Sequence, residues 1–150
     1  MSFSISFLEE PLFFPYDDES IPAAAGRLAL GDEHEGFHAS LFLWTKRDYE
    51  TQWRQAIRTL LSGADRAALI TEYIGPGAGR LWWWPMYKID ETVYLHEQIL
   101  FFNQLKEPFL LARAFSFIGD RQTINDEGDV ISEWSASLLE VQEFADSLGT

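Results

Sequence analysis

Cysteine is absent from this 150-residue sequence, and so are long apolar runs. Without cysteine the chain has neither disulfide bonds nor thiolate metal ligands, which fits a reducing compartment. The longest apolar run, LWWWPMY at residues 81–87, is far shorter than the ~20 residues of a transmembrane helix. Glu9 and Glu10 interrupt the apolar N-terminus, and a secretory signal would stay apolar there. We therefore expect a cytoplasmic protein that makes no contact with the membrane.

Positive charge is also scarce. The chain has 11 Lys and Arg residues against 24 Asp and Glu residues, and its net charge is -13. Residues 1–38 and residues 120–150 each hold eight acids and one base, whereas the stretch between them is nearly neutral. A field of this sign repels phosphate backbones, so we expect no direct contact with nucleic acid. Attraction of a basic protein partner and simple solubility both remain open as explanations.

Strand patterns occupy most of the chain. Alternating or β-branched apolar runs between turn residues predict strands at residues 27–31, 37–44, 67–74, 80–88, 92–102 and 130–134. The loops between them have hairpin length, and GPGAG joins two of the strands, so we expect an antiparallel sheet. Pro85 cannot donate to a ladder, which places its strand at an edge or next to a bulge.

Two amphipathic helices accompany these strands. Thr45 and Asp48 form a capping-box pattern before the first helix, and Gly63 follows its end. Ser137 and Glu140 repeat the capping box before a C-terminal helix. Residues 108–115 suggest a short third helix. Both long helices have one apolar stripe to place on the sheet, which predicts an α+β fold in a single domain.

The first 26 residues have a different character from the rest. Three prolines interrupt them, and the acidic stretch DDES at residues 17–20 has turn composition. We expect an acidic and aromatic arm over residues 1–26, tied to the domain by some of its phenylalanines. The domain itself is expected to span residues 27–150.

The string HEGFH at residues 34–38 matches the zinc motif H-E-x-x-H. That motif requires a helix, and Gly31 and Gly36 each disfavour one by about 1 kcal/mol. In a strand, the four steps from His34 to His38 span up to roughly 13 Å, too far to share one metal. The remaining histidine, His96, has no motif around it. We expect an acidic turn here and no metal site.

No pattern in the sequence indicates catalysis. The chain has no G-x-S-x-G string, and GPGAG lacks the lysine and the spacing of a P-loop. Its carboxylates gather in turns, where solvated charge is the ordinary explanation. We therefore expect a protein that is not an enzyme and uses no cofactor.

Trp82, Trp83 and Trp84 alternate in direction if they lie in a strand. An exposed tryptophan among them would mark a binding surface, whereas the alternative is that the fold buries all three. An exposed set would also permit stacking on single-stranded nucleic acid, against which the charge argues.

Five strings occur in a fixed order along the chain. They are RDYETQW (47–53), AALITEYIGP (67–76), WWPMYKIDETVYLHEQIL (83–100), ISEW (131–134) and SLLEVQEF (137–144). In this order the sequence resembles the immunity proteins of bacterial contact-dependent growth inhibition systems, from about residue 27 to residue 148. The resemblance implies an α+β domain with a curved antiparallel sheet, one helix after the first strands and one C-terminal helix.

The resemblance also implies a small cytoplasmic inhibitor. Such proteins bind the C-terminal toxin domain of a cognate surface effector, commonly a nuclease, and block its active site or substrate path. The motif residues Tyr49, Trp53 and Trp134 are expected in the core rather than at the toxin. The competing hypotheses are an acidic interaction module with an unknown partner and a single-stranded nucleic-acid-binding sheet protein.

A nuclease holds phosphates on a basic surface, which an acidic protein can occupy. We therefore expect two acidic loops, at residues 32–35 and 126–129, to contact Lys or Arg of the toxin in a complex with a monomeric inhibitor. The predicted contact residues are Asp32, Glu33, Glu35, Asp126, Glu127 and Asp129.

Overall fold

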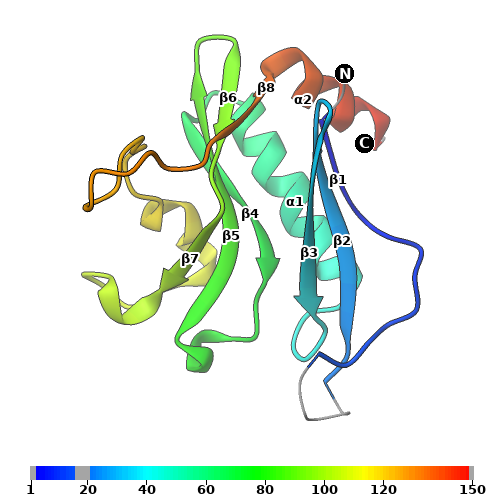
Figure 1. Cartoon of the computed structure of the whole chain (residues 1–150). Coiled ribbons are helices and arrows are strands. Elements are labelled where there is room, and N and C mark those ends of the chain that lie inside the picture. Colours follow the sequence, from blue (N-terminus) through cyan, green and yellow to red (C-terminus); the bar gives the residue numbers. More distant parts are fainter. Residues whose placement is uncertain (1–2, 16–20, 149–150) are drawn as a thin grey trace.

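Eight strands and two α-helices make up the computed structural model, which describes residues 3–15 and 21–148 (Figure 1). The turn predicted at residues 17–20 lies outside the described residues. The strands are β1 (Phe3–Phe7), β2 (Ala23–Leu30), β3 (Glu33–Ser40), β4 (Arg66–Glu72), β5 (Arg80–Ile89), β6 (Thr92–Leu95), β7 (Gln98–Phe101) and β8 (Trp134–Ser137). The helices are α1 (Lys46–Leu61) and α2 (Leu138–Ser147). Short 3-10 segments lie at Pro76–Ala78, Phe102–Gln104 and Leu111–Phe117.

A three-stranded antiparallel sheet has the order β1-β2-β3. Phe3 pairs with Leu30 and Phe7 with Gly26, so β1 runs along β2, and Phe3 and Ile5 are buried in the core. The structure therefore differs from the expected arm, because β1 belongs to the domain and the boundary at residue 26 falls inside β2. The prolines that suggested an arm all lie in the connection between β1 and β2.

The second sheet has the order β4-β5-β6-β8, and β7 also pairs with β5. On the side of β5 away from β4, β7 pairs with the first half of β5 and β6 with its second half. The short stretch of chain between β6 and β7 does not pair as a strand, which leaves a gap along that side of β5. Pro85 stands at this interruption, where its carbonyl accepts from His96 N at 3.1 Å. A strand residue directs its N–H and C=O to the same neighbour, so the missing N–H of Pro85 faces the break. The prediction of an edge strand is therefore wrong, since β5 has partners on both sides, and Pro85 lies opposite the gap between β6 and β7.

Helix α1 fills the angle between the two sheets (Figure 1). Its capping box is confirmed, because the Thr45 side chain accepts from Asp48 N and the Asp48 carboxylate accepts from Thr45 N. The predicted stripe faces the core, where the Trp53 ring lies 5.0 Å from Phe7 and 5.7 Å from Phe37. The stripe thereby joins the three-stranded sheet to the rest of the core.

Two side chains of α1 also bond to the edge of β4 that faces away from β5. The Gln52 amide donates to Ala68 O and accepts from Ile70 N, both at 2.8 Å. The Trp53 indole donates to Ile70 O at 2.7 Å. These bonds satisfy edge groups that would otherwise be open to another strand.

Tyr49 completes the same arrangement at the ends of β3 and β4. Its buried hydroxyl donates to Ser40 O at 2.7 Å and accepts from Tyr73 N at 3.0 Å. RDYETQW thus contributes Tyr49, Gln52 and Trp53 to fixing α1 against the two sheets. The expectation that Tyr49 and Trp53 lie in the core is confirmed.

Helix α2 closes one end of the molecule (Figure 1). Its predicted capping box is confirmed by Glu140 N donating to Ser137 Oγ at 3.0 Å and Ser137 N donating to Glu140 Oε1 at 3.1 Å. The Phe144 ring meets Phe3 of β1 edge to face at 5.6 Å. A predicted C-terminal element and an unpredicted N-terminal strand therefore stabilise each other.

Residues 102–133 lie on the side of the five-stranded sheet opposite the three-stranded sheet, in yellow and orange in Figure 1. The short helix predicted at 108–115 is a 3-10 segment that begins later, at Leu111. The strand predicted at 130–134 is reduced to a single bridge between Ile124 and Val130, and β8 starts at Trp134. The α+β class is confirmed, with antiparallel strands divided between two sheets.

Candidate functional site

The HEGFH string lies in β3, an extended strand paired with β2. His34 and His38 therefore stand on one face of the strand but four residues apart, and the Phe13 ring packs edge-on against His38 at 4.8 Å. No group of three His, Asp or Glu side chains able to hold a metal ion occurs within residues 3–15 and 21–148. The HEGFH string therefore lacks the helical conformation that the zinc motif requires.

The first acidic loop is shorter than expected. Gly31, at φ +66°, and Asp32 form the turn, and β3 begins at Glu33. Glu33 and Glu35 are therefore strand residues, paired with Leu30 and Leu28 respectively. Asp32 and Glu33 are exposed, whereas Glu35 is half-buried on the face that also bears Phe37. Two of the three predicted contact residues in this loop are therefore exposed to solvent, and the third is half-buried.

Glu35 approaches a cleft between the two sheets. The cleft has a volume of about 330 Å³ and is lined by Gly36, Phe37, His38, Thr71, Glu72, Arg80, Trp82 and Glu97. Burial, together with the nearby Glu35 carboxylate, raises the pKa of Glu97. Glu35 of β3 and Glu97, between β6 and β7, therefore lie close enough to repel each other beside this cleft, which Arg80 also lines.

The tryptophan run supplies one wall of this cleft. Trp83 and Trp84 are buried, and the Trp83 indole donates to Gln98 Oε1 at 2.8 Å. Trp84 packs against Trp134 at 5.0 Å, while Trp82 is half-buried and lines the cleft. Two of the three rings are thus committed to the core, which leaves no row of exposed rings on β5 for bases to stack on.

The second acidic loop is a tight turn. Asn125 Oδ1 accepts from Glu127 N at 2.9 Å and from Asp129 N at 3.0 Å, and Gly128 takes the left-handed conformation at φ +85°. The carboxylates of Asp126, Glu127 and Asp129 are all exposed. All three predicted contact residues of this loop therefore reach solvent.

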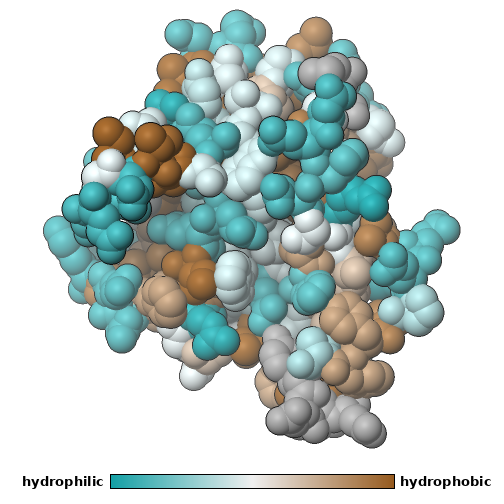
Figure 2. Space-filling view, viewed as in Figure 1, coloured by the Kyte–Doolittle hydropathy of each residue, from teal (hydrophilic) through white to brown (hydrophobic). Residues whose placement is uncertain are grey.

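The fold does not bring the two acidic loops together. The β2–β3 turn lies beside α2, whereas the second loop lies in the orange segment on the far side of the five-stranded sheet (Figure 1). Figure 2 shows hydrophilic side chains between them and a hydrophobic patch over the orange segment. A toxin domain that contacts both loops therefore has to span this face of the molecule.

A polar cluster that sequence reasoning missed fixes the orange segment to the sheet. Arg121 donates to Glu133 through Nε at 2.8 Å and through Nη2 at 2.6 Å, a bidentate pair. His96 Nε2 lies 2.7 Å from Glu133 Oε2, and because a carboxylate only accepts, the imidazole carries the proton. The Arg121 guanidinium also stacks over the Tyr94 ring at 4.2 Å. We call Tyr94, His96, Arg121 and Glu133 the clamp.

The clamp has a clear electrostatic signature. Hydrogen bonds from Arg121, with a further one from His96, lower the pKa of Glu133 although its partial burial opposes this. The same pairing raises the pKa of Arg121. Within the clamp, Arg121 and Glu133 are therefore both charged at neutral pH, and each of the two side chains is only about a quarter exposed.

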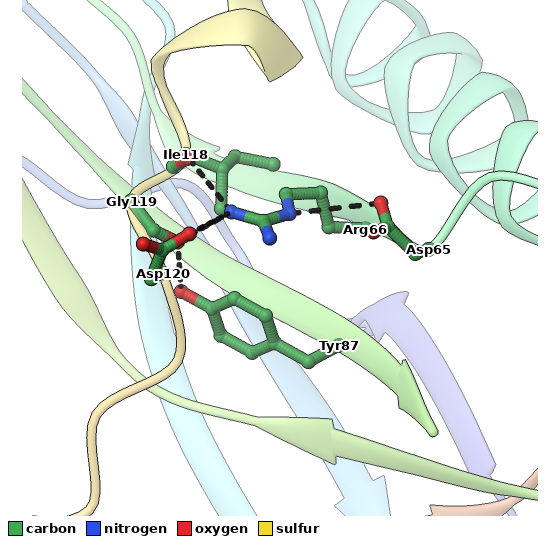
Figure 3. Close-up of polar contacts among 6 residues, drawn as sticks. All are labelled: Asp65, Arg66, Tyr87, Ile118, Gly119 and Asp120. Atoms are coloured by element: carbon green, nitrogen blue, oxygen red, sulfur yellow. Dashed lines mark hydrogen bonds and ion pairs between the residues drawn. The ribbon is translucent and has the colours of Figure 1, made fainter. Parts of the chain in front are cut away.

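Figure 3 shows a second anchor, around Arg66 and Tyr87, and the Tyr87 ring lies 5.5 Å from the His96 ring of the clamp. Arg66 Nη1 donates to Gly119 O at 3.0 Å and lies 3.3 Å from Asp120 Oδ1, while the Tyr87 hydroxyl donates to Gly119 O at 2.9 Å. Burial raises the pKa of Tyr87, so its hydroxyl remains a donor at neutral pH. Arg66 and Tyr87 thus fix the chain immediately before the clamp.

The motif strings carried a signal for these anchors. WPMY contains Tyr87, VYLH contains Tyr94 and His96, and ISEW contains Glu133. Sequence order places these strings one after another along the chain, but it does not show that their polar residues meet. Arg121 lies in no quoted string, so its pairing with Glu133 appears first in the structure.

Comparison with known proteins identifies the relatives of this chain. The family model described as the CdiI N-terminal domain matches residues 39–144. The curated immunity protein CdiI of Enterobacter cloacae subsp. cloacae is 29% identical over 122 residues, which cover 81% of this chain and 83% of that protein. A solved CdiA-CT/CdiI toxin and immunity complex from Enterobacter cloacae contains a chain with a TM-score of 0.84 and 27% identity, covering 97% of both chains. Within the described residues, neither α1 nor α2 is long and apolar enough to cross a bilayer.

Proposed function

The chain belongs to the CdiI immunity protein family, and we propose that it binds and neutralises the C-terminal toxin domain of a cognate contact-dependent growth inhibition effector. The observation that carries the proposal is the structural similarity to a chain of a solved toxin and immunity complex, which extends over nearly the whole length of both chains. The role is that of a cytoplasmic, monomeric inhibitor that performs no chemistry of its own.

We further propose that the toxin is a nuclease and that this chain occludes its active site or substrate path. A nuclease needs a basic surface for phosphates, and the net charge of -13 complements such a surface. The two acidic ends of the sequence contain all six predicted contact residues, which are Asp32, Glu33, Glu35, Asp126, Glu127 and Asp129. Electrostatic steering would raise the association rate toward ~10⁸–10⁹ M⁻¹s⁻¹ at low salt.

Nucleic-acid binding by the sheet is disfavoured by the burial of Trp83 and Trp84, in addition to the charge. An acidic interaction module with another partner is the remaining alternative. A pull-down with the C-terminal toxin domain of the cognate effector discriminates the two.

The direct test combines binding with protection. The C-terminal toxin domain of the cognate surface effector is produced in cells with and without this chain, and growth is followed. We expect growth to be restored and the two purified proteins to form a 1:1 complex in solution. Continued toxicity, with no complex by calorimetry, would exclude the proposed function.

The electrostatic part has its own test. Charge reversal of both loops, with Lys at all six predicted positions, is expected to slow association by about tenfold or more and to flatten its dependence on salt. The control for a general change in net charge reverses six other exposed acids, so that the net charge changes by the same amount. They are Glu9, Glu10, Glu50, Glu91, Glu143 and Asp146. Equal rates for the loop variant and the wild-type chain would remove the electrostatic mechanism and leave binding intact.

A further inference from the structure

The segment between Arg121 and Glu133, which we call the projecting hairpin, exposes aliphatic side chains beside its carboxylates. Val130 is 83% exposed, the highest value among the large hydrophobic residues of the described chain, and Ile124 is 56% exposed. The two residues pair with each other through an isolated antiparallel bridge. They therefore form one adjacent pair rather than two scattered surface residues.

The hairpin is ordered although its tip buries little apolar surface. Ile131 N donates to Thr123 O and Asn125 N donates to Asp129 O, each at 2.9 Å. The Asn125 side chain holds the turn between these two bonds. Folding has thus fixed the positions of Ile124 and Val130 without removing them from water.

The base of the hairpin explains how it stays in place. Arg121 and Glu133 stand at its two ends and bond to each other, while His96 and Tyr94 tie them to the sheet. The bidentate pair of Arg121 and Glu133 and the contact with His96 therefore hold a loop whose tip is exposed. This arrangement limits the conformational entropy that a partner would have to remove on binding.

Charge indicates the chemistry of the partner. Between the clamp residues the hairpin has three carboxylates and no Lys or Arg. An aliphatic pair surrounded by negative charge complements an apolar floor with a basic rim. A tip with charges of both signs around its apolar residues would not favour a basic partner in this way.

We propose that the projecting hairpin is the principal docking element for the toxin domain. Ile124 and Val130 enter a cleft with an apolar floor, and Asp126, Glu127 and Asp129 pair with Lys or Arg on its rim. The inference rests on the proposed function and deepens it, because it assigns the loop at 126–129 the leading role and the loop at 32–35 a supporting one. It also adds two apolar contacts that charge complementarity by itself does not require.

The test compares matched serine substitutions by calorimetry with the same purified toxin domain. The double variant Ile124→Ser, Val130→Ser is expected to weaken binding by about thirtyfold or more, because buried aliphatic anchors dominate affinity. Leu139→Ser is the control, since Leu139 is 66% exposed on α2 and far from the hairpin. Affinity of the double variant within twofold of the wild type would overturn the docking role while the proposed function stands.

Hydrogen exchange on the unmodified chain gives an independent readout. Addition of the toxin domain is expected to protect the amides of residues 123–131 more than those of residues 31–35. The reverse order of protection would overturn the inference. A wild-type chain that fails to bind the toxin domain at all would remove the proposed function together with it.

The alternative role for Ile124 and Val130 is contact between two copies of this chain. Sedimentation of the chain alone is expected to give a monomer for the wild type and for the double variant. A wild-type dimer that the double variant loses would assign the pair to contacts between copies and overturn the docking role.

Discussion

The two acidic loops carry similar charge but are held by different forces. The β2–β3 turn belongs to a hairpin of eight-residue strands whose inner face includes Leu28 and Phe37 in the core. The projecting hairpin is tied to the sheet by the polar clamp and by the anchor at Arg66 and Tyr87. Apolar burial couples the first loop to global stability, whereas charged hydrogen bonds couple the second loop to local order and to pH.

Removal of the apolar support should produce the largest effect. Phe37 packs on Trp53 and Phe7 and lies directly over Gly26, where no side chain would fit. We expect Phe37→Ala to lower the free energy of unfolding by about 3–5 kcal/mol. Urea denaturation followed by tryptophan fluorescence measures this change.

The control for that substitution lies on the same strand. Glu33→Ala removes an exposed side chain and should change the free energy of unfolding by less than about 0.5 kcal/mol. Equal effects of the two substitutions would mean that the core does not support the β2–β3 hairpin.

Breaking the clamp should have an intermediate effect. Glu133→Gln keeps the shape of the side chain but removes the charge that Arg121 and His96 contact. We expect a loss of about 1–2 kcal/mol, less than for a fully buried pair because the groups are partly exposed. Hydrogen exchange should show faster opening at Asn125 and Ile131, with residues 31–35 unaffected.

Glu127→Gln is the matched control for the clamp, since Glu127 is an exposed carboxylate of the same hairpin. Its exchange rates should equal those of the wild type. Faster exchange in both variants would trace the effect to hairpin charge in general rather than to the clamp.

The clamp also makes a specific contribution to pH dependence. The pKa of Glu133 is lower in the folded chain than its ordinary value of 4.5, so its stabilising effect is fully present above pH ~4.5. The effect is lost as pH falls through the lower pKa of the folded state. The stability difference between the wild type and Glu133→Gln should therefore be constant near neutral pH and shrink below pH ~4.5. A difference that grows on acidification would contradict this assignment.

The second anchor should contribute less than the clamp. Tyr87→Phe removes the hydrogen bond to Gly119 O while leaving the ring in place. We expect a loss of about 1 kcal/mol in the free energy of unfolding. Tyr94→Phe keeps the ring under Arg121 and should be close to neutral. A larger loss at Tyr94 than at Tyr87 would reverse this ranking.

The smallest effect is expected at the tip of the projecting hairpin. Val130→Ser should leave the thermal unfolding midpoint within about 1 °C of the wild type, because Val130 is mostly exposed and contributes little burial. A clear loss of stability would show that Val130 packs within the domain, and would weaken its assignment as a docking residue.

Local patterns predicted the parts of the fold whose causes are local. Both capping boxes, at Thr45 and Ser137, formed where the sequence placed them, because their hydrogen bonds join residues three positions apart. The hairpin around GPGAG also formed as expected. In contrast, β1 was not predicted, because the three prolines after it suggested an arm although Phe3, Ile5 and Phe7 alternate as in a strand.

The candidate site was less accessible to sequence reasoning. The predicted contact carboxylates were assigned to two acidic turns, but the start of β3 at Glu33 depends on pairing with Leu30 across the hairpin. The clamp joins His96, Arg121 and Glu133, which are 12 to 37 positions apart. Residue patterns along the sequence do not predict contacts over such separations, because these contacts depend on how residues 102–133 pack against the sheet.

The sequence by itself determined the two long helices, their caps, most of the strands, the charge and the family resemblance, because these depend on residue type, short spacing and the order of motifs. The tertiary structure decided that the N-terminal residues complete a sheet, that the two acidic loops lie apart, and that a buried histidine holds one of them in place. The physical reason is that propensity and capping act within a few residues, whereas burial and ion pairing depend on distances that only the folded chain sets.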